Sequence, residues 1–138
     1  MSKLDGHCLC GSITYSCDAE PVATAVCHCT ECQRQTGTAF SIVVGLPADA
    51  LEVKGDTLAM IKTPGDAHDG ETERNFCSAC GSPIFSLSPA IPGVAWLKAG
   101  TLDDTSWLEP QMEVWGRSAQ PWVAEVEGRP RAETVPGA

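Results

Sequence analysis

Residues Ser12 to Cys17 read SITYSC, a stretch in which apolar and polar side chains alternate without interruption. Ile13, Tyr15 and Cys17 fall on one face of an extended chain, and the serine and threonine side chains between them fall on the other. This two-residue period is typical of a half-buried β-strand. Thirteen glycines and ten prolines in the whole chain indicate frequent short turns, so we expect this strand to be one of many.

Short segments of the same kind follow along the rest of the chain, separated by glycine, proline and aspartate at turn positions. The only helical candidates are single turns near Ala48–Ala50 and Glu31–Gln35, so long helices are not expected. Further strands are predicted at Thr24–His28, Phe40–Leu46, Leu51–Val53, Thr57–Lys62, Thr72–Phe76, Ile84–Leu87, Val94–Lys98 and Met112–Arg117. The sequence therefore predicts an all-β fold of short antiparallel strands.

The chain of 138 residues has the length of one ordinary domain and can bury about two thirds of its unfolded surface. No internal repeat, long linker or low-complexity block divides it, so residues 1–138 are predicted to form a single domain. The last residues, 128–138, read GRPRAETVPGA and show no apolar period. We expect this tail to be frayed or to lie over the surface.

The composition argues against several classes of partner. A formal net charge of −9 would repel phosphate backbones, and the nine basic residues are scattered along the chain, so no nucleic-acid partner is expected. No apolar run approaches the ~20 residues that cross a membrane, and residues 1–26 lack the apolar segment of a signal peptide. We therefore expect a cytoplasmic protein with no membrane partner.

Eight cysteines in a reducing compartment are better explained as metal ligands than as disulfides. Cys77 and Cys80 lie in CSACG, the pattern of a zinc knuckle, in which the glycine lets backbone N–H groups approach the sulfurs. Cys8 and Cys10 are two residues apart in an extended segment, so their side chains emerge on one face. Each pair is half of a tetrahedral site, and together they predict a structural zinc held by four thiolates.

A second group of cysteines lies in Cys27–Cys32, which reads CHCTEC and offers three thiols from one tight loop. Structural zinc sites have four protein ligands, whereas catalytic sites have three and leave a position for water or substrate. The count therefore favours an open zinc site. Closure by a fourth ligand, a disulfide and an iron–sulfur arrangement are the alternatives. The candidate fourth ligands are His7, Cys17, His28 and His68.

These motifs and their neighbours resemble the glutathione-dependent formaldehyde-activating family, which also includes the zinc domain of centromere protein V. The resemblance is carried by GHCLCG at 6–11, CHCTEC at 27–32 with Thr36, Gly37 and Phe40, and FCSACGS at 76–82. Softer matches are AGTLD at 99–103, Val114-Trp115 and Pro121-Trp122. The likeness extends from about 6 to 123, which we take as the core of the domain.

The resemblance implies both a fold and an activity. The fold is a β-tent around a structural zinc, whose ligands would be Cys8, Cys10, Cys77 and Cys80. The reaction centre is a second zinc, whose ligands would be Cys27, Cys29 and Cys32. The activity is that of a carbon–sulfur lyase: glutathione adds to formaldehyde to give S-hydroxymethylglutathione, and the reverse reaction cleaves the carbon–sulfur bond. Two zinc ions per chain are expected, the second of them more easily lost.

Three thiolates would leave a bound zinc with a net charge of −1, which weakens its pull on a carbonyl and favours binding of the thiol. Arg34 is the candidate partner for a carboxylate of glutathione, although an arginine that balances Glu31 in solvent is an equal interpretation. Family members often carry a histidine at the position of Glu113, so the resemblance leaves room for a different substrate here.

Two other functions stay open. A zinc-stabilised binding module of the same family would need no turnover, and the family includes centromere-associated proteins without an established reaction. A thiol–disulfide oxidoreductase could use Cys77 and Cys80, but no thioredoxin-like βαβ context surrounds them. The loop TPGDAHDG at 63–70 could be a lid or a simple turn. The four tryptophans are expected to fill the core, and one of them could line a pocket as well.

Overall fold

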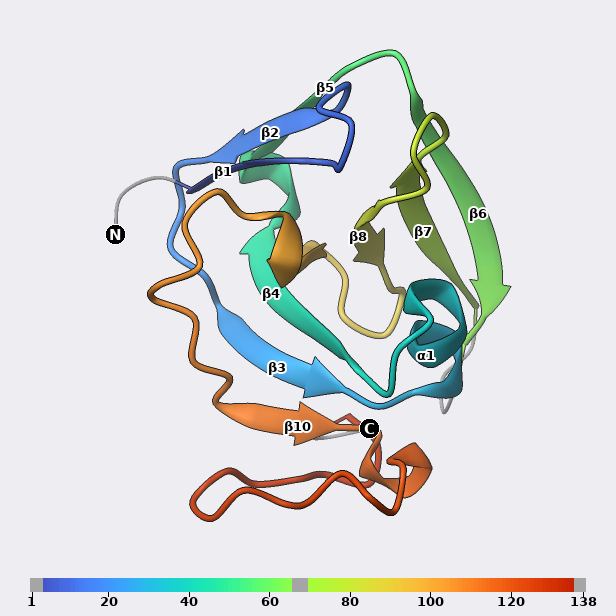
Figure 1. Cartoon of the computed structure of the whole chain (residues 1–138), viewed down its shortest axis with the longest axis vertical. Helices are drawn as coiled ribbons and strands as arrows, with labels where there is room; N and C mark the ends of the chain where they lie inside the picture. Colours follow the sequence, from blue (N-terminus) through green and yellow to red (C-terminus); the bar gives the residue numbers. More distant parts are fainter. Residues whose placement is uncertain (1–3, 66–69, 136–138) are drawn as a thin grey trace.

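The computed structural model of the chain describes residues 4–65 and 70–135, which consist mostly of β-strands in two sheets (Figure 1). Among these residues, the smaller sheet has three strands in the order β1-β2-β5, and the larger has seven in the order β10-β3-β4-β9-β8-β7-β6. The strands are β1 (Leu4–His7), β2 (Thr14–Cys17), β3 (Ala23–Cys27), β4 (Ser41–Pro47), β5 (Leu51–Lys54), β6 (Leu58–Pro64), β7 (Glu71–Cys77), β8 (Pro83–Leu87), β9 (Val94–Lys98) and β10 (Met112–Val114). The all-β fold predicted from the sequence is confirmed.

Helical structure in the described residues is short. The α-helix α1 spans Thr30–Thr36, and 3₁₀ turns lie at Ala48–Ala50, Ala99–Thr101 and Gly116–Ser118. Within 4–65 and 70–135, no helix has the length and apolar content that a membrane crossing requires.

Strand β2 forms as the alternation in SITYSC predicts, with Tyr15 and Cys17 buried and Thr14 exposed. Strand β1, which no pattern in the sequence predicted, pairs with β2 in antiparallel register from Leu4 opposite Cys17 to His7 opposite Thr14. The β1 sequence LDGH has a single apolar side chain. Pairing with β2, rather than an apolar face of its own, therefore determines this strand.

The main core lies between the two sheets. Ile13, beside β2, meets Leu46, Ile84 and Leu97 of the large sheet, and all four side chains are fully buried. Burying an aliphatic side chain of this size contributes about 1.5–3 kcal/mol. This core holds the small sheet against one face of the large sheet.

The other face of the large sheet carries side chains that lie opposite one another in register. One row crosses from β3 to β7 through Ala23, Gly45, Trp96, Ser86 and Arg74. A second row crosses from β10 to β9 through Met112, Ala25, Val43 and Lys98. Cross-strand partners point to the same face, and the sheet curls so that β3 and β4 lie across from β6 and β7, with α1 near the end of β3 (Figure 1). Residues far apart in sequence are thereby gathered on one concave face.

Strand β10 corrects the prediction of a purely antiparallel sheet. It pairs with β3 in parallel, from Met112 opposite Ala25 to Val114 opposite Cys27. The strand ends at Val114, short of the predicted end, because Trp115 takes a left-handed conformation with φ 54° and a 3₁₀ turn follows. This turn brings Trp115 to the same face as the second row.

The C-terminal tail does not fray between residues 128 and 135. The backbone N–H of Glu113 donates to the carbonyl of Pro130 at 2.9 Å, and the N–H of Ala132 donates to the carbonyl of Glu113 at 2.9 Å. Backbone pairing along β10 orders these residues, which agrees with the second of the two expectations for the tail, that it lies over the surface. Residues 136–138 lie outside the described part of the chain.

Candidate metal centres

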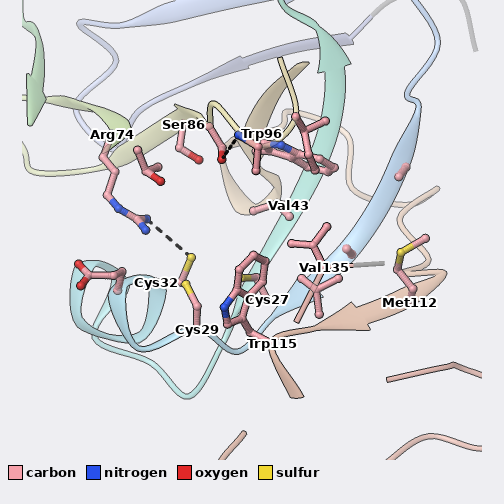
Figure 2. A pocket seen from close by; sticks show the side chains of 18 of the residues that line it. Cys27, Cys29, Cys32, Val43, Arg74, Ser86, Trp96, Met112, Trp115 and Val135 are labelled. Carbon is pink, nitrogen blue, oxygen red and sulfur yellow. Dashed lines mark hydrogen bonds between the residues drawn. The ribbon is translucent and has the colours of Figure 1, made fainter. Parts of the chain in front are cut away.

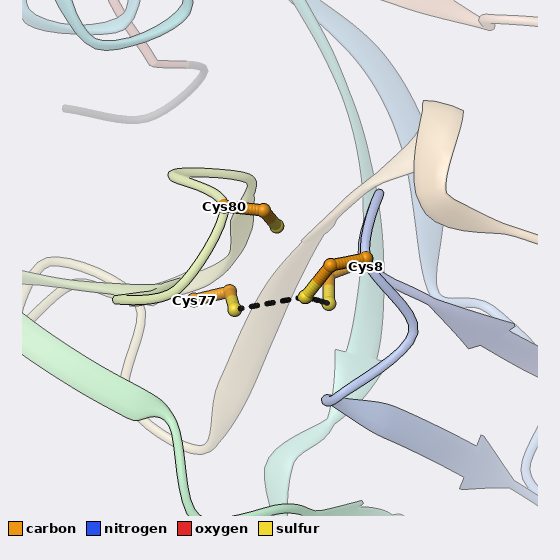
Figure 3. A group of neighbouring side chains, drawn as sticks. Cys8, Cys77 and Cys80 are labelled. Atoms are coloured by element: carbon orange, nitrogen blue, oxygen red, sulfur yellow. Dashed lines mark hydrogen bonds between the residues drawn. The ribbon is translucent and has the colours of Figure 1, made fainter.

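The four cysteines of the predicted structural site come together where the loop after β1 meets the turn between β7 and β8 (Figure 3). Their sulfurs all lie within 4.8 Å of one another. Cys8 Sγ is 3.7 Å from Cys10 Sγ, and Cys10 Sγ is 3.8 Å from Cys77 Sγ. Four sulfurs bound tetrahedrally to zinc at ~2.3 Å are separated from one another by about 3.8 Å. The donor atoms and their spacing therefore fit a tetrahedral thiolate site.

Hydroxyl groups around this cluster favour thiolates. The Ser12 and Thr57 hydroxyls lie 3.3 Å and 3.2 Å from Cys77 Sγ, and their hydrogen bonds lower the pKa of Cys77 to about 5. The Ser82 hydroxyl lies 3.2 Å from Cys80 Sγ, and its hydrogen bond lowers the pKa of Cys80 to about 7. Because the thiolate is the form that binds metal, these two ligands are prepared near neutral pH.

The three cysteines of CHCTEC also come together, and all three are buried. Cys27 ends β3, Cys29 caps the N-terminus of α1, and Cys32 lies in the first turn of the helix. Cys29 Sγ accepts a hydrogen bond from the backbone N–H of Cys32 at 3.3 Å, which satisfies one of the free donors of the helix start. The helix ends at Gly37, whose φ of 69° is the left-handed conformation that favours glycine. Both ends of α1 are thus fixed by the local sequence.

Among residues 4–65 and 70–135, none of the candidate fourth ligands joins this cluster. Cys17 is buried in the main core between the sheets. His7 is exposed and hydrogen-bonded to an aspartate. His28 is fully buried, and its Nε2 bonds to Glu113 at 2.7 Å. His68 lies outside the described residues, as does half of the loop at 63–70 that the sequence offered as a lid.

Two buried cations lie beside Cys32. Arg74 Nη1 donates to Cys32 Sγ at 3.7 Å, and Lys98 Nζ donates to it at 3.9 Å; the two residues are 4% and 6% exposed. Hydrogen bonds from the thiols of Cys27 and Cys29 lower the pKa of Cys32, and the charges of Lys98 and Arg74 lower it further. Hydrogen bonds with the other two cysteines, together with burial, raise the pKa of Cys27. The metal-free cluster therefore favours a thiolate at Cys32.

Sequence reasoning missed both cations, because Arg74 and Lys98 are 42 and 66 residues from Cys32. Cross-strand register brings them to the cluster, and register is not visible in one sequence. The usable signal was the two-residue period of a strand. Arg74 is two residues after Thr72 in a predicted strand, so both side chains point to the same face, and both are buried.

A cavity of about 310 Å³ opens beside the three-cysteine cluster (Figure 2). Polar groups line one end of it: Cys29, Cys32, Thr72, Arg74 and Ser86. Apolar groups line the other end: Ala25, Val43, Trp96 and Met112. Val114 also lines the cavity, but it packs with the three cysteines. Figure 2 shows Arg74 reaching toward Cys32 on one side, with Trp96 and Val43 across the space from them. The cavity therefore joins a reactive polar end to an apolar one.

Gly45 shapes the apolar end. A Cβ placed on Gly45 would lie 2.8 Å from Cζ3 of the Trp96 ring, which is closer than side-chain carbons pack. The absence of a side chain at Gly45 lets the indole of Trp96 rest against β4 instead of projecting into the cavity.

Two expectations about pocket residues change. Arg34 lies on the exposed side of α1 and does not line the cavity, whereas Arg74 does. Trp96 and Trp115 line the cavity, and Trp122 is 73% exposed. The expectation that all four tryptophans fill the core is therefore wrong.

A buried ionic network lies behind the cysteines and gives Glu113 a role that the sequence left open. Glu113 Oε1 accepts hydrogen bonds from His28 Nε2 at 2.7 Å and from Arg131 Nε at 2.8 Å, and Arg129 Nη1 lies 3.5 Å from Oε2. Burial raises the pKa of Glu113, but the hydrogen bonds from His28 and Arg131 outweigh burial, so the pKa lies below its usual value. Because His28 stands between two cysteines of the cluster, the network joins the cysteine loop to the C-terminal tail.

Comparison with known proteins agrees with these motifs. A family model described as glutathione-dependent formaldehyde-activating enzyme matches residues 3–118. The chain belongs to this family. A family relative in Talaromyces marneffei, provisionally named glutathione-dependent formaldehyde-activating enzyme, is 27% identical over 114 residues, or 79% of this chain. A relative of the same provisional name in Halomonas elongata is 26% identical over 130 residues, or 91% of this chain.

The match covers 58% of the Talaromyces relative and 82% of the Halomonas relative. The crystal structure of a Rhodobacter sphaeroides protein is also similar, with a TM-score of 0.58 and 18% identity over 77% of this chain and 91% of that one. At this identity the likeness concerns the fold alone. Family membership and fold are thus established, and the reaction has to be argued from the site.

Proposed function

We propose that the protein is a zinc-dependent carbon–sulfur lyase, or synthase in the opposite direction, that acts on adducts of a thiol and an aldehyde. S-hydroxymethylglutathione, formed from glutathione and formaldehyde, is the reference substrate. One observation carries the proposal: the cluster of Cys27, Cys29 and Cys32 lines the cavity and has no fourth ligand among the described residues. Three thiolates with an open position are the ligand pattern of a catalytic zinc.

The four-cysteine cluster is proposed to hold a structural zinc. Its ligands are Cys8, Cys10, Cys77 and Cys80. They would tie the loop after β1 to the turn between β7 and β8, so metal binding would contribute directly to folding. Four thiolates complete a tetrahedron and leave no position for substrate.

The charges around the open cluster support binding of an anionic sulfur. Three thiolates and one zinc ion sum to −1, and the buried side chains of Arg74 and Lys98 bring the sum to +1. One further anion, the sulfur of the substrate thiol, brings it to zero. Because uncompensated charge is costly in a buried site, the open position favours a thiolate over a neutral aldehyde.

Within this proposal, Cys27, Cys29 and Cys32 hold the metal, and zinc bound there supplies positive charge that stabilises the substrate sulfur as a thiolate. Arg74 lines the cavity beside Cys32 and donates a hydrogen bond to the oxygen of the adduct. Arg34, outside the cavity, is the proposed partner of a glutathione carboxylate. In the addition, a sulfur–carbon bond forms, the carbonyl π bond opens, and the proton of the thiol ends on the oxygen.

Metal analysis and turnover measured on the same preparation test the proposal. We expect two zinc ions per chain and formation of S-hydroxymethylglutathione faster than in buffer. Cys29→Ala should lose one zinc and the acceleration. Cys17→Ala is the matched control, because Cys17 is a buried cysteine outside both clusters, and it should keep both.

A protein that holds two zinc ions but is no faster than buffer would contradict the lyase assignment. X-ray absorption at the zinc edge, with and without glutathione, would then distinguish the alternative. A sulfur ligand gained without turnover would identify a zinc-stabilised binding module.

A further inference from the structure

We propose that the cavity selects adducts whose aldehyde-derived carbon chain is uncharged and apolar, with roughly four to eight carbons. This inference rests on the proposed function for the reaction itself. It adds the class of substrate, which neither the family description nor the names of the relatives contain.

The apolar end of the cavity is built from residues in direct register. Met112, Ala25 and Val43 lie opposite one another on β10, β3 and β4, and so form one continuous wall. The Trp96 ring closes this wall beside Val43. Among the described lining residues, only Glu31 and Arg74 are charged, and neither belongs to this end. A ligand group placed against this wall meets the carbon atoms of Met112, Ala25, Val43 and Trp96.

The size of the cavity limits how much of an adduct can enter. A volume of about 310 Å³ has room for about ten groups the size of a water molecule. Glutathione alone has about twenty non-hydrogen atoms, so its sulfur can enter but most of the peptide cannot. The remaining space beyond the sulfur is apolar and exceeds what a single formaldehyde carbon fills.

The charges of glutathione also indicate that its sulfur enters the cavity while most of the peptide stays outside. Its two carboxylates and one ammonium would have to be paired if buried, because an unpaired buried charge is strongly unfavourable. Arg74 already uses two of its nitrogens within the protein: Nε donates to Thr63 at 2.9 Å, and Nη1 donates to Gln35 at 3.1 Å. The proposed function assigns its remaining nitrogen to the oxygen of the adduct, so Arg74 does not pair a carboxylate of glutathione. The charged ends of the thiol therefore stay outside, and the carbon chain of the aldehyde takes the apolar end.

The chemical step needs no further reagent. For an aldehyde RCHO and a thiol R′SH, a carbon–sulfur bond forms, the carbonyl π bond breaks, and the thiol proton moves to the oxygen to give RCH(OH)SR′. The addition changes the oxidation state of neither the carbonyl carbon nor the sulfur, so no oxidant or reductant takes part. A longer R changes only what fills the apolar end of the cavity.

The test compares aldehydes with the zinc-loaded full chain, glutathione as the thiol, and the buffer rate subtracted. Butanal and hexanal report chain length, and 6-oxohexanoate has the length of hexanal but ends in a carboxylate. Each buried methylene should raise kcat/KM about fourfold, so hexanal should exceed butanal by roughly tenfold or more. Hexanal should also exceed 6-oxohexanoate by at least about tenfold. Equal values for hexanal and 6-oxohexanoate, or a preference for the charged aldehyde, would overturn the proposal.

Variants of the wall should shift this preference in opposite directions. Ala25→Leu fills the apolar end and should lower the hexanal-to-butanal ratio several-fold. Val43→Ala enlarges it and should raise the ratio of octanal to hexanal, which keeps the test usable if Ala25→Leu does not fold. Ala124→Leu adds the same atoms at an exposed position outside the cavity and should leave both ratios unchanged. If neither wall variant changes these ratios, the assignment of the aldehyde chain to this cavity is contradicted.

A binding measurement separates this inference from the reaction. The tryptophan fluorescence of the protein, to which Trp96 and Trp115 in the cavity wall contribute, should respond to 1-hexanol at lower concentration than to 6-hydroxyhexanoate. Ala25→Leu should weaken the response to 1-hexanol. If no aldehyde is turned over but this preference holds, the proposed function fails and the cavity inference stands. If the two alcohols bind equally, the inference fails whatever the turnover.

Discussion

Replacing Arg131 by methionine tests whether the C-terminal tail stabilises the three-cysteine loop. Arg131 Nε lies 2.8 Å from Glu113 Oε1, and the two side chains are 13% and 4% exposed. Removal of one partner from a buried ion pair costs about 3–5 kcal/mol. His28 and Arg129 stay beside the carboxylate, so we expect a loss near the lower end, about 3 kcal/mol of unfolding free energy.

Urea unfolding followed by circular dichroism measures this loss. Free zinc must be held constant, because metal that binds the native state shifts the midpoint. Arg34→Met is the matched control, since Arg34 is exposed, and should change stability by less than about 0.5 kcal/mol. The double variant Arg131→Met with Glu113→Gln should lose about 1–3 kcal/mol less unfolding free energy than the two single variants lose together. A loss below about 1 kcal/mol, or additive single losses, would refute the ionic link.

The same network predicts a pH dependence with a definite sign. In the folded protein the pKa of Glu113 lies below its ordinary value of 4.5, so the stabilisation by Glu113 is complete above that pH and is lost as the pH falls through the lowered pKa. When the pH is lowered from 4.5, the unfolding free energy of the Glu113→Gln variant should therefore fall less than that of the parent protein. Acid also releases metal from cysteines in both proteins, so the difference between them isolates Glu113.

Three further predictions concern the site. Gly45→Ala should push the Trp96 ring into the cavity and lower the preference for longer aldehydes, measured as the hexanal-to-butanal ratio of kcat/KM. Lys98→Met should weaken zinc binding at the three-cysteine cluster roughly tenfold, because a cation beside Cys32 is lost. Lys54→Met, at an exposed position, is the control, and competition with a chelating dye measures the zinc affinity of both variants. Stepwise chelation should remove one zinc with little change in circular dichroism and a second with loss of the folded signal; simultaneous loss of both would contradict separate catalytic and structural roles.

Much of the fold was predictable because it rests on local patterns. Alternation in SITYSC indicated β2, and the turn residues placed most strand boundaries within a few positions. The grouping of cysteines was predictable for a similar reason, because ligands two or three residues apart can reach one ion. Strand β1 was missed because LDGH carries no alternation and is determined by its partner strand.

The remainder of the site depends on register between distant strands. Arg74 and Lys98 reach Cys32 only because β7, β8, β9 and β4 align as they do, and nothing in a single sequence states that alignment. The link between Glu113 and Arg131 was hidden for another reason. The tail has no apolar period, and it is ordered by backbone pairing and a buried ion pair, neither of which leaves a hydrophobic pattern.

The separation of the two cysteine clusters along the chain has a consequence during translation. The three cysteines of CHCTEC are complete once residue 32 has been made, whereas Cys8 and Cys10 must wait for Cys80, 48 residues after Cys32. At ~5–20 residues per second, this interval is roughly 2–10 s. A nascent chain can therefore acquire metal at the open cluster while the first two thiols are still unpaired. On the ribosome, the site proposed for catalysis would be loaded before the site proposed to hold the fold together.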